Sequence, residues 1–312
     1  MPAAPGVAIV TGATGGLGYA TAVGLARTGA RVVLAGRNPA KGEAALARLR
    51  REAGDAVASF ELLDLASLAS VAAFAERMMA AHPALDILVN NAGVMAPPSR
   101  QVTADGFEVQ FETNYLSHFA LTARLLPTLL RAEGKAHVVQ VSSLAHRSAA
   151  IAWGDLQGER RYSGWRSYGQ SKLATLMFAL ELARRAAARG WPLVSVAAHP
   201  GWAVTDIIAN GPGGGTLGLK EHAMLAGFRL FGQSAAEGAR PIVYAATSPD
   251  AKPGSYYGPA GFQEIKGAPG PSRIMPQAQD AEAAKRLWMV SETLAGVTFP
   301  EQGNLTATIG KT

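Results

Sequence analysis

The chain has 312 residues, of which 48% are hydrophobic and 17% are charged, the balance of a folded protein rather than a disordered one. Its 29 lysines and arginines exceed its 23 acidic residues. They never run longer than pairs such as Arg50-Arg51, so the clustered charge of a nucleic-acid-binding protein is missing. The absence of cysteine excludes disulfides, thiolate-bound metals, iron–sulfur clusters and cysteine nucleophiles.

The beginning of the chain does not predict a secretory signal, because its first basic residue is Arg27 and a glycine-rich loop begins at Thr11. No uncharged stretch reaches the ~20 apolar residues of a membrane span without glycine or proline. We therefore expect a cytoplasmic protein with no membrane span. The histidines form neither His-Glu-x-x-His nor another close pair of ligands, so no metal site is predicted.

Short β-rich runs alternate with segments of helical spacing along most of the chain. Near-continuous apolar strands that alternate with helices indicate a parallel sheet buried on both faces and connected by right-handed crossovers. The sequence therefore predicts an α/β fold with a doubly wound, mostly parallel sheet of about seven strands and helices on both faces. Strands are predicted at Val7–Val10, Arg31–Ala35, Ser59–Leu63, Ile87–Asn90, His137–Val141 and Leu193–Ala198.

A glycine-rich turn follows the first predicted strand and opens the first helix. Glycines let a dinucleotide pyrophosphate approach the backbone, and the helix N-terminus attracts its charge. No Gly-Lys-Ser/Thr follows, which excludes the phosphate-binding loop of nucleotide hydrolases, while a turn used only for packing is the alternative. The predicted cofactor contacts here are Gly12, Thr14, Gly15, Gly16, Leu17 and Gly18.

The turn after the second predicted strand indicates which dinucleotide binds. An acidic residue there would hold the 2′-hydroxyl of NAD, whereas a basic residue accommodates the 2′-phosphate of NADP. The sequence has Arg37, Asn38 and Lys41 at this place and no carboxylate. We therefore predict that NADP(H) is preferred over NAD(H), with these three residues as contacts. A solvated surface arginine is the alternative interpretation of Arg37.

Two long helices are expected in the middle of the chain, at residues 104–132, with a break or bend near Pro127, and at residues 168–189. Two long connections depart from the regular alternation, at residues 144–167 and 201–232. In a doubly wound sheet they leave the carboxyl ends of strands, where ligands bind. We expect them to be substrate loops, although surface excursions without a function are the alternative.

Tyr168 and Lys172 lie four residues apart near the start of a predicted helix and therefore share one face. A phenol with a pKa of about 10 is a poor acid or base at neutral pH. A fixed cation beside it favours the phenolate and makes proton transfer practical. This pair alone is weak evidence for catalysis, because two common residue types often fall at this spacing by chance.

Together, these motifs resemble those of the short-chain dehydrogenase/reductase family in order and approximate spacing, over essentially the whole chain. Within that family the chain resembles the NADP-dependent branch that contains retinol dehydrogenases, in Gly36–Gly42, Val141–His146 and the long Ser143 to Tyr168 interval. The resemblance implies a Rossmann fold that forms a single domain over residues 1–312. The motifs are Thr11-Gly-x-x-x-Gly16-x-Gly18, Asp64-Leu65, Asn90-Asn91-Ala92-Gly93, Ser143, Tyr168-x-x-x-Lys172 and Pro200-Gly201.

The resemblance implies hydride transfer between the nicotinamide and a ketone or aldehyde, or the corresponding alcohol. Tyr168 would be the general acid and base, and Lys172 would lower its pKa and bond the nicotinamide ribose. Ser143 would hydrogen-bond the substrate oxygen. Strand alternation sends Ser142 and Ser143 to opposite faces, and the spacing to Tyr168 favours Ser143. Asn114 would distort its helix and hold a water linked to the lysine; an asparagine on the helix surface is the alternative.

The remaining cofactor contacts are also implied by the resemblance. Asp64 and Leu65 would meet the adenine edge, although a plain turn aspartate is a comparable interpretation of Asp64. The turn after the fourth strand would line the adenosine side, and the segment after the sixth strand would approach the nicotinamide. These contacts are Asn91, Ala92 and Gly93 in the turn, and Pro200, Gly201 and Thr205 in the later segment.

Aromatic side chains in the two long connections favour a bulky or lipophilic small-molecule substrate, with ordinary packing of loops as the alternative. They are Trp153, Trp165, Trp202, Phe228 and Phe231. The long helices offer surfaces for the homodimers and homotetramers that are common in the family.

Two other functions remain open. One is an extended-type epimerase or dehydratase, against which the Asn90–Gly93 turn and the lack of a sizeable C-terminal substrate domain argue. The other is a regulatory protein that senses NADP without turnover, against which the intact set of Asn114, Ser143, Tyr168 and Lys172 argues.

Overall fold

The computed structural model describes residues 6–54, 56–203 and 232–300. Within them eight strands form one sheet in the order β3-β2-β1-β4-β5-β6-β7-β8. Neighbouring strands are parallel except β7 and β8. The strands are β1 (Val7–Thr11), β2 (Arg31–Gly36), β3 (Ala58–Leu62), β4 (Ile87–Asn90), β5 (Ala136–Val141), β6 (Leu193–Ala198), β7 (Tyr256–Pro259) and β8 (Pro269–Pro271).

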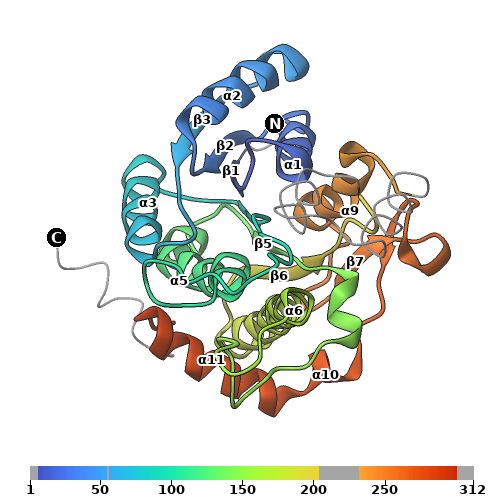
Figure 1. The fold of residues 1–312 in the computed structure, drawn as a ribbon. Coiled ribbons are helices and arrows are strands. Elements are labelled where there is room, and N and C mark those ends of the chain that lie inside the picture. The colour runs from blue at the N-terminus through green and yellow to red at the C-terminus, as the bar shows by residue number, and fades with distance from the viewer. Residues whose placement is uncertain (1–5, 55, 204–231, 301–312) are drawn as a thin grey trace.

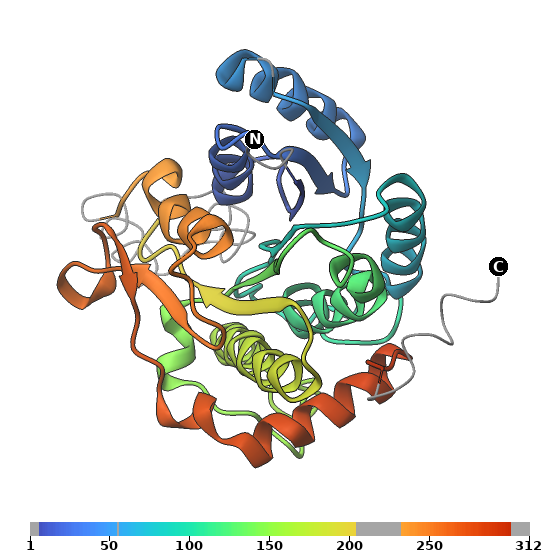
Figure 2. The ribbon, with the colours of Figure 1, turned by 180° about the vertical axis from the view of Figure 1, so that it is seen from behind.

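Helices cover both faces of this sheet (Figures 1 and 2). One face carries α1 (Gly16–Ala26), α2 (Pro39–Ala53) and α9 (Ala235–Thr247). The other carries α3 (Leu68–Ala81), α5 (Ser117–Leu129) and α6 (Gly164–Arg189), with α10 (Pro276–Gln279) and α11 (Ala281–Ala295) against α6. None of the helices in the described ranges combines the length and the apolar character needed to cross a membrane.

The predicted doubly wound α/β fold is confirmed, with eight strands in place of about seven. The six strands expected from apolar runs are all present, with ends that differ by at most one residue. The sequence pattern did not identify β7 and β8, because they are short and rich in glycine and proline, which are depleted in strands. The Pro-Gly-Pro of β8 lies at one edge of the sheet.

At the opposite edge, arginine side chains bond the backbone of β3. Arg50 Nη2 donates to the carbonyl oxygen of Ala58 at 3.2 Å, and Arg77 Nη2 donates to that of Leu62 at 2.7 Å. The carbonyl of Val57 instead accepts from a β2 amide, so alternation along β3 turns the carbonyls of Ala58 and Leu62 away from the sheet.

The helix expected at residues 104–132 is wrong at its beginning and in its interior. Residues 104–108 form a turn with Gly106 at φ 87°, and the helix begins with α4 (Val109–Phe111). A π-helical turn, η1 (Glu112–Leu116), then leads into α5. The break expected near Pro127 is absent, because α5 continues to Leu129, and the irregularity lies three turns earlier, at η1.

The connection expected at residues 144–167 is shorter than predicted. It opens with a 3₁₀ helix, η2 (Leu144–Ser148), and α6 begins at Gly164 rather than at residue 168. Most of the second expected loop, residues 201–232, lies outside the described residues, and its role as a substrate loop stays a prediction.

Chain reversal in the sheet locates the ligand-binding edge. The chain runs outward from β1 to β3 and then returns to place β4 on the other side of β1. The connections after β1 and β4 therefore diverge at the carboxyl ends of these strands, which is where ligands bind in doubly wound sheets.

Candidate active site

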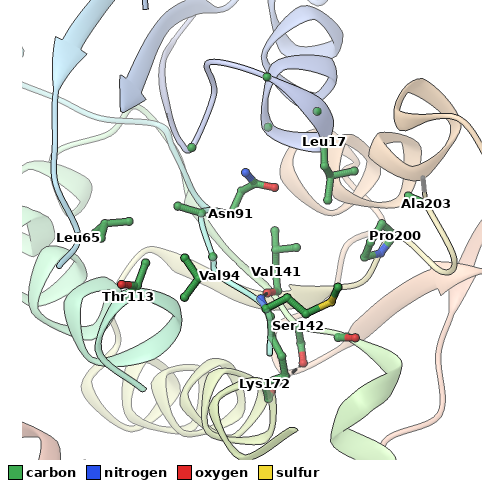
Figure 3. A pocket seen from close by; sticks show the side chains of 18 of the residues that line it. Leu17, Leu65, Asn91, Val94, Thr113, Val141, Ser142, Lys172, Pro200 and Ala203 are labelled. Carbon is green, nitrogen blue, oxygen red and sulfur yellow. Dashed lines mark hydrogen bonds between the residues drawn. The ribbon is translucent and has the colours of Figure 1, made fainter. Parts of the chain in front are cut away.

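A cavity of about 850 Å³ opens at the carboxyl ends of β1 to β6. In Figure 3, Leu17 and Pro200 lie on one side of the cavity, Leu65 and Thr113 lie on the opposite side, and Lys172 lies below them. The cavity thus lies at the reversal between β1 and β4, and its volume is within the range of ligand sites.

Nearly all predicted site residues line this one cavity. The exceptions among the described residues are Asn38 and Asn114, and Thr205 lies outside the described residues. The predicted residues that line it are Gly12, Thr14, Gly15, Gly16, Leu17, Gly18, Arg37, Lys41, Asp64, Leu65, Asn91, Ala92, Gly93, Ser143, Tyr168, Lys172, Pro200 and Gly201.

The glycine loop has a backbone that other residues could not adopt without strain. Gly12 and Gly16 have φ values of 66° and 51°. A Cβ on Gly18 would lie 2.3 Å from the Gly12 carbonyl oxygen. Helix α1 follows from Gly15, whose position provides no side chain to cap the first-turn amides. These amides are therefore available to an anionic group in the cavity.

Thr11 ties the glycine loop to the turn after β4. Its Oγ1 accepts hydrogen bonds from the amides of Asn91 and Ala92, at 2.9 and 3.0 Å, and lies 2.9 Å from His118 Nε2. Asn91 Nδ2 donates to the Thr11 carbonyl at 2.8 Å. The buried Asn91 Oδ1 has no hydrogen-bond partner among the described residues, so it remains available to a donor in the cavity.

The predicted contact residues in and after the turn that follows β2 have two different roles. Arg37 and Lys41 line the cavity, so a positive charge lies at this end of it. Asn38 instead begins α2, since its Oδ1 accepts a hydrogen bond from Lys41 N at 3.0 Å. All three were expected to be cofactor contacts, but the side chain of Asn38 serves as a helix cap.

Ser143, Tyr168 and Lys172 meet on the wall formed by β5 and α6. Ser143 lies close enough to the Tyr168 phenol to lower its pKa. Lys172 Nζ donates to the carbonyl oxygen of Val141 at 2.9 Å and lies 5.8 Å from the centroid of the Tyr168 ring. A hydroxyl pair and a buried ammonium therefore face one region of the cavity.

Burial dominates the acid–base behaviour of this group. It raises the pKa of Tyr168, an effect that Ser143 opposes. It lowers the pKa of Lys172 to about 8. The pKa of Tyr168 is thus raised overall because desolvation of the phenol is the larger effect, and the lowering expected from Lys172 stays a prediction.

Asn114 lies behind the cavity in the π-helical turn η1, so the helix is distorted at this residue as the resemblance implied. Its Oδ1 accepts from Val94 N at 2.7 Å, and its Nδ2 donates to Val94 O at 3.0 Å and Ser171 Oγ at 2.9 Å. Ser171 Oγ in turn donates to the Tyr168 carbonyl at 2.8 Å. The surface alternative is excluded, because Asn114 is 1% exposed.

Ser142 and Ser143 both line the cavity, but their hydroxyls have different partners. Ser142 Oγ is buried and donates to the carbonyl of Lys172 at 2.7 Å. Ser143 begins η2, where its Oγ accepts from Ala145 N at 3.2 Å.

The cavity wall beside Tyr168 is apolar. The Trp165 ring lies edge-on to the Tyr168 ring, with 6.2 Å between centroids, and Met95 packs against the same tyrosine. Trp202 also lines the cavity, whereas Trp153 packs against Arg286 and lines a separate hollow. Phe228 and Phe231 lie outside the described residues.

Sequence reasoning missed several lining residues, of which Val94, Met95 and Thr113 are the most consequential. The first two directly follow the Asn90–Gly93 turn, so extending that motif would have found them. Nothing in the sequence indicated Thr113, because its position depends on the π-helical turn. Across the described ranges no three His, Asp or Glu side chains gather as a metal site would require.

Comparison with known proteins identifies the family. The family profile of short chain dehydrogenases matches residues 6–211. Retinol dehydrogenase 12 of Mus musculus is 39% identical over 298 residues, which cover 94% of this chain and 87% of that protein. Polyprenol dehydrogenase of Mus musculus is 41% identical over 302 residues, which cover 95% and 86%.

Solved structures agree with this assignment. An uncharacterized protein from Mycobacterium paratuberculosis has a TM-score of 0.78 and 39% identity, with 96% of each chain covered. A protein from Beutenbergia cavernae, described as an NAD(P)-dependent gluconate 5-dehydrogenase with bound NADP, has a TM-score of 0.60 and 26% identity, covering 80% of this chain and 91% of that one.

This chain therefore belongs to the short-chain dehydrogenase/reductase family of oxidoreductases, in the branch that resembles the retinol dehydrogenases. Its cavity is that of a nicotinamide-dependent enzyme.

Proposed function

We propose that this protein is an NADP(H)-dependent oxidoreductase that transfers hydride between the nicotinamide and a bulky, lipophilic ketone or aldehyde, or the corresponding alcohol. The observation that carries the proposal is the shared cavity, in which Ser143, Tyr168 and Lys172 face the space that the glycine loop and Arg37 also line. A proton donor and a dinucleotide cradle in one cavity are what hydride transfer to a carbonyl requires.

The residues of the cavity fit a dinucleotide. The uncapped amides that follow Gly15 suit the pyrophosphate, and the absence of a side chain on Gly18 lets α1 pack closely against the Gly12 backbone of the loop. The unpartnered Asn91 Oδ1 suits a ribose hydroxyl. Arg37 and Lys41 at the end of β2 suit a 2′-phosphate, which supports NADP over NAD.

When bound, the cofactor would supply or accept the hydride. The chain would supply the proton and fix the carbonyl oxygen. Ser143 Oγ would donate to that oxygen and stabilise its developing charge, while Tyr168 Oη would donate the proton that becomes the alcohol hydrogen. Burial holds the proton on Tyr168. The ammonium of Lys172, which lies 5.8 Å from the centroid of the Tyr168 ring, would stabilise the phenolate that is left after transfer.

The substrate class follows from the apolar wall beside the reacting groups. Met95, Trp165 and Trp202 would shield a carbonyl carbon from water and favour a large hydrocarbon body. Two similar proteins are named for retinol and polyprenol, which are both long isoprenoid alcohols. We therefore place isoprenoid and aromatic carbonyl compounds above small aliphatic ones.

The test is NADPH oxidation by the purified protein with a panel of aldehydes and ketones from small aliphatic to aromatic and isoprenoid. Turnover should be highest with the bulky apolar members. Tyr168→Phe should lower the rate by at least about 100-fold, because it removes the transferable proton, while leaving NADPH affinity nearly unchanged. Absorbance of the reduced nicotinamide measures the turnover rate, and a binding titration measures the affinity for NADPH.

Tyr244→Phe is the matched control, because Tyr244 lies on α9 and pairs with the ring of Tyr257 outside the cavity. It should keep the wild-type rate. A Tyr168→Phe variant with more than about a tenth of the wild-type rate would show that Tyr168 is not the proton donor. NADPH binding without oxidation by any panel member would favour a sensing protein, and turnover of a nucleotide sugar would favour an epimerase.

A further inference from the structure

Glu264 is an acidic residue outside the cavity lining that contacts two segments which form it. It ends a 3₁₀ turn, η4 (Phe262–Glu264), in the connection between β7 and β8. Its Oε2 lies 2.8 Å from Arg147 Nη2 and 3.0 Å from His199 Nε2. Its Oε1 accepts from Arg273 N at 3.2 Å. One carboxylate thus receives donors from three parts of the chain.

The Arg147 contact reaches the substrate oxygen site through η2. Arg147 lies on this 3₁₀ helix, which Ser143 begins by accepting from Ala145 N. The His146 ring also bonds the Ser143 carbonyl at 2.7 Å. Because η2 is only five residues long, holding Arg147 restricts where the Ser143 hydroxyl can lie.

The His199 contact reaches the part of the cavity wall that follows β6. His199 follows β6, its side chain is 0% exposed, and its Nδ1 accepts a hydrogen bond from Gly201 N at 3.1 Å. When the ring is neutral, Nε2 therefore carries the proton and directs it at Glu264 and Ser272, which lie 3.0 and 2.8 Å away. This tautomer fixes Pro200 and Gly201, which line the cavity.

The backbone around Glu264 is strained in a way that these contacts offset. Gln263 and Glu264 have φ values of 52° and 59°, a region that residues other than glycine rarely adopt. Such strain persists only when the surroundings over-determine the conformation. Three contacts hold the segment in place. They are the ion pair of Glu264 with Arg147, its hydrogen bond with His199, and a hydrogen bond from Trp202 N to the carbonyl of Ile265.

We propose that Glu264 is a positioning residue that, through Arg147 and His199, sets the distance between the Ser143 hydroxyl and the Pro200–Gly201 wall of the cavity. This inference rests on the proposed hydride transfer, since these two walls enclose the space beside Tyr168. The carboxylate touches neither substrate nor cofactor in this arrangement.

The main test is Glu264→Gln, which keeps the size of the side chain but removes its charge and one acceptor. We expect kcat to fall by at least about tenfold, because reacting groups misplaced by about 1 Å can cost 100-fold. The NADPH dissociation constant should change by less than about threefold, since the glycine loop and Arg37 do not contact Glu264. Stability should also fall, because Arg147 loses its counter-charge.

Glu181→Gln is the matched control. Glu181 is a carboxylate on α6 whose side chain is 5% exposed and which pairs with Arg184 and Arg185 at 2.8 and 2.7 Å. It lies more than three turns beyond Tyr168 along the helix, outside the cavity. This variant should lose stability while keeping kcat within about twofold of wild type.

A readout independent of turnover comes from ¹⁵N-histidine NMR of the whole protein. The wild type should show one ring, assigned by its loss in His199→Gln, that is neutral and protonated at Nε2, and Glu264→Gln should shift that signal. If Glu264→Gln does not fold, Arg147→Leu breaks the same pair from the other side. In a folded double variant the two losses of kcat should not add, because the residues act as a unit.

The proposal is overturned if Glu264→Gln and Arg147→Leu keep wild-type kcat while losing stability as Glu181→Gln does, or if the His199 signal does not respond. Those outcomes require an active wild type. An inactive wild type with an intact Nε2-protonated His199 signal would instead reject the proposed function and leave the contact geometry in place.

Discussion

Lys172 is a cation in the protein interior, and its position costs stability. The residue is 3% exposed, and burial lowers its pKa from 10.5 to about 8. A shift of this size corresponds to free energy on the order of 3 kcal/mol. Active sites often contain groups that lower the stability of the fold, because activity requires them.

Lys172→Met should therefore stabilise the fold while it abolishes turnover. The loss of the bond to Val141 offsets part of the gain, which leaves on the order of 2 kcal/mol at pH 7. Since the folded pKa lies below the unfolded one, the lysine penalty is full below pH ~8 and disappears as the pH rises to ~10.5. Urea unfolding at pH 7 and 10 would show whether the gain shrinks in this way.

Lys285→Met is the control for that measurement, because Lys285 is exposed on α11 and pairs with Glu282. Lys285→Met should not raise the free energy of unfolding. Equal stability of Lys172→Met and wild type at pH 7 would show that the buried ammonium is fully compensated in the folded state.

Arg37 determines cofactor choice in our proposal. A charge-assisted hydrogen bond to the 2′-phosphate contributes about 1.5–3 kcal/mol, which corresponds to one to two decades of preference. Arg37→Asp should reverse the ratio of kcat/KM for NADPH and NADH, because it repels the phosphate and accepts from the free ribose hydroxyl. Arg51→Asp, at the far end of α2, should leave the ratio unchanged. An unaltered ratio in Arg37→Asp would exclude the phosphate contact.

The sequence was sufficient to identify residues whose type and spacing carry the chemistry. Tyr168, Lys172, Ser143 and the glycines were found because a phenol, an ammonium and a flexible backbone have few substitutes in their roles. Glu264 was not found, because its partners Arg147 and His199 lie far from it in the sequence. Only the packing of the connections after β5, β6 and β7 brings these three side chains together.

At the scale of elements, the π-helical turn η1 decides which side chains between β4 and α5 face the site. It shifts the helix register, so Asn114 turns toward Val94 and Ser171 while Thr113 lines the cavity. Hydrophobic periodicity assumes a constant angle per residue and cannot reveal such a change. The helix start was misjudged for a related reason, because Gly106 and the Glu108 cap act locally.

Glu112, at the start of the same turn, should make stability depend on pH. Burial raises its pKa to about 8, and the carboxylates of Asp105 and Asp64 add to the shift. The folded state therefore holds a proton that the unfolded state releases above its ordinary pKa of 4.5. The contribution of Glu112 to the free energy of unfolding therefore falls as the pH rises from ~4.5 to ~8.

Glu112→Gln should remove that loss. The melting temperatures of the variant and of wild type should be equal at pH 4. The variant should then melt at an increasingly higher temperature than wild type as the pH rises, and the difference should stay constant above pH ~8. Thermal unfolding from pH 4 to 9 would test this. Glu43→Gln, an exposed residue of α2, should show no such trend, and a pH-independent difference for Glu112→Gln would contradict a buried neutral carboxyl.

At the scale of the whole molecule, an aromatic cluster joins α11 and Phe299 to α5 and α6, of which α6 carries Tyr168 and Lys172. Trp288 on α11 lies 5.0 Å from Phe119, 5.6 Å from Phe178 and 4.4 Å from Phe299, measured between ring centroids. Phe119 belongs to α5 and Phe178 to α6. The cluster therefore fixes α5 against α6, and with them the turn that holds Asn114.

Trp288→Ala should lower the free energy of unfolding by about 3–5 kcal/mol, because it opens a cavity among rings that cannot close over it. Its neighbour Met289 is 59% exposed, and Met289→Ala should change stability by less than ~0.5 kcal/mol. Denaturant unfolding compares the two. A loss below ~1 kcal/mol for Trp288→Ala would mean that α11 contributes little to the core.

The two edges of the sheet have a consequence for how copies of this chain can meet. Along β8, Pro269 and Pro271 alternate with the residues whose backbone hydrogen-bonds to β7 and its flanks, such as Ala268 and Ser272, and neither proline has an N–H to offer a further strand. On β3 the outward carbonyls of Ala58 and Leu62 already accept from arginines. Both edges thus resist strand addition, which guards a long parallel sheet against polymerising edge to edge. We therefore expect any oligomer to form through helices and loops, so that its sheets stay separate.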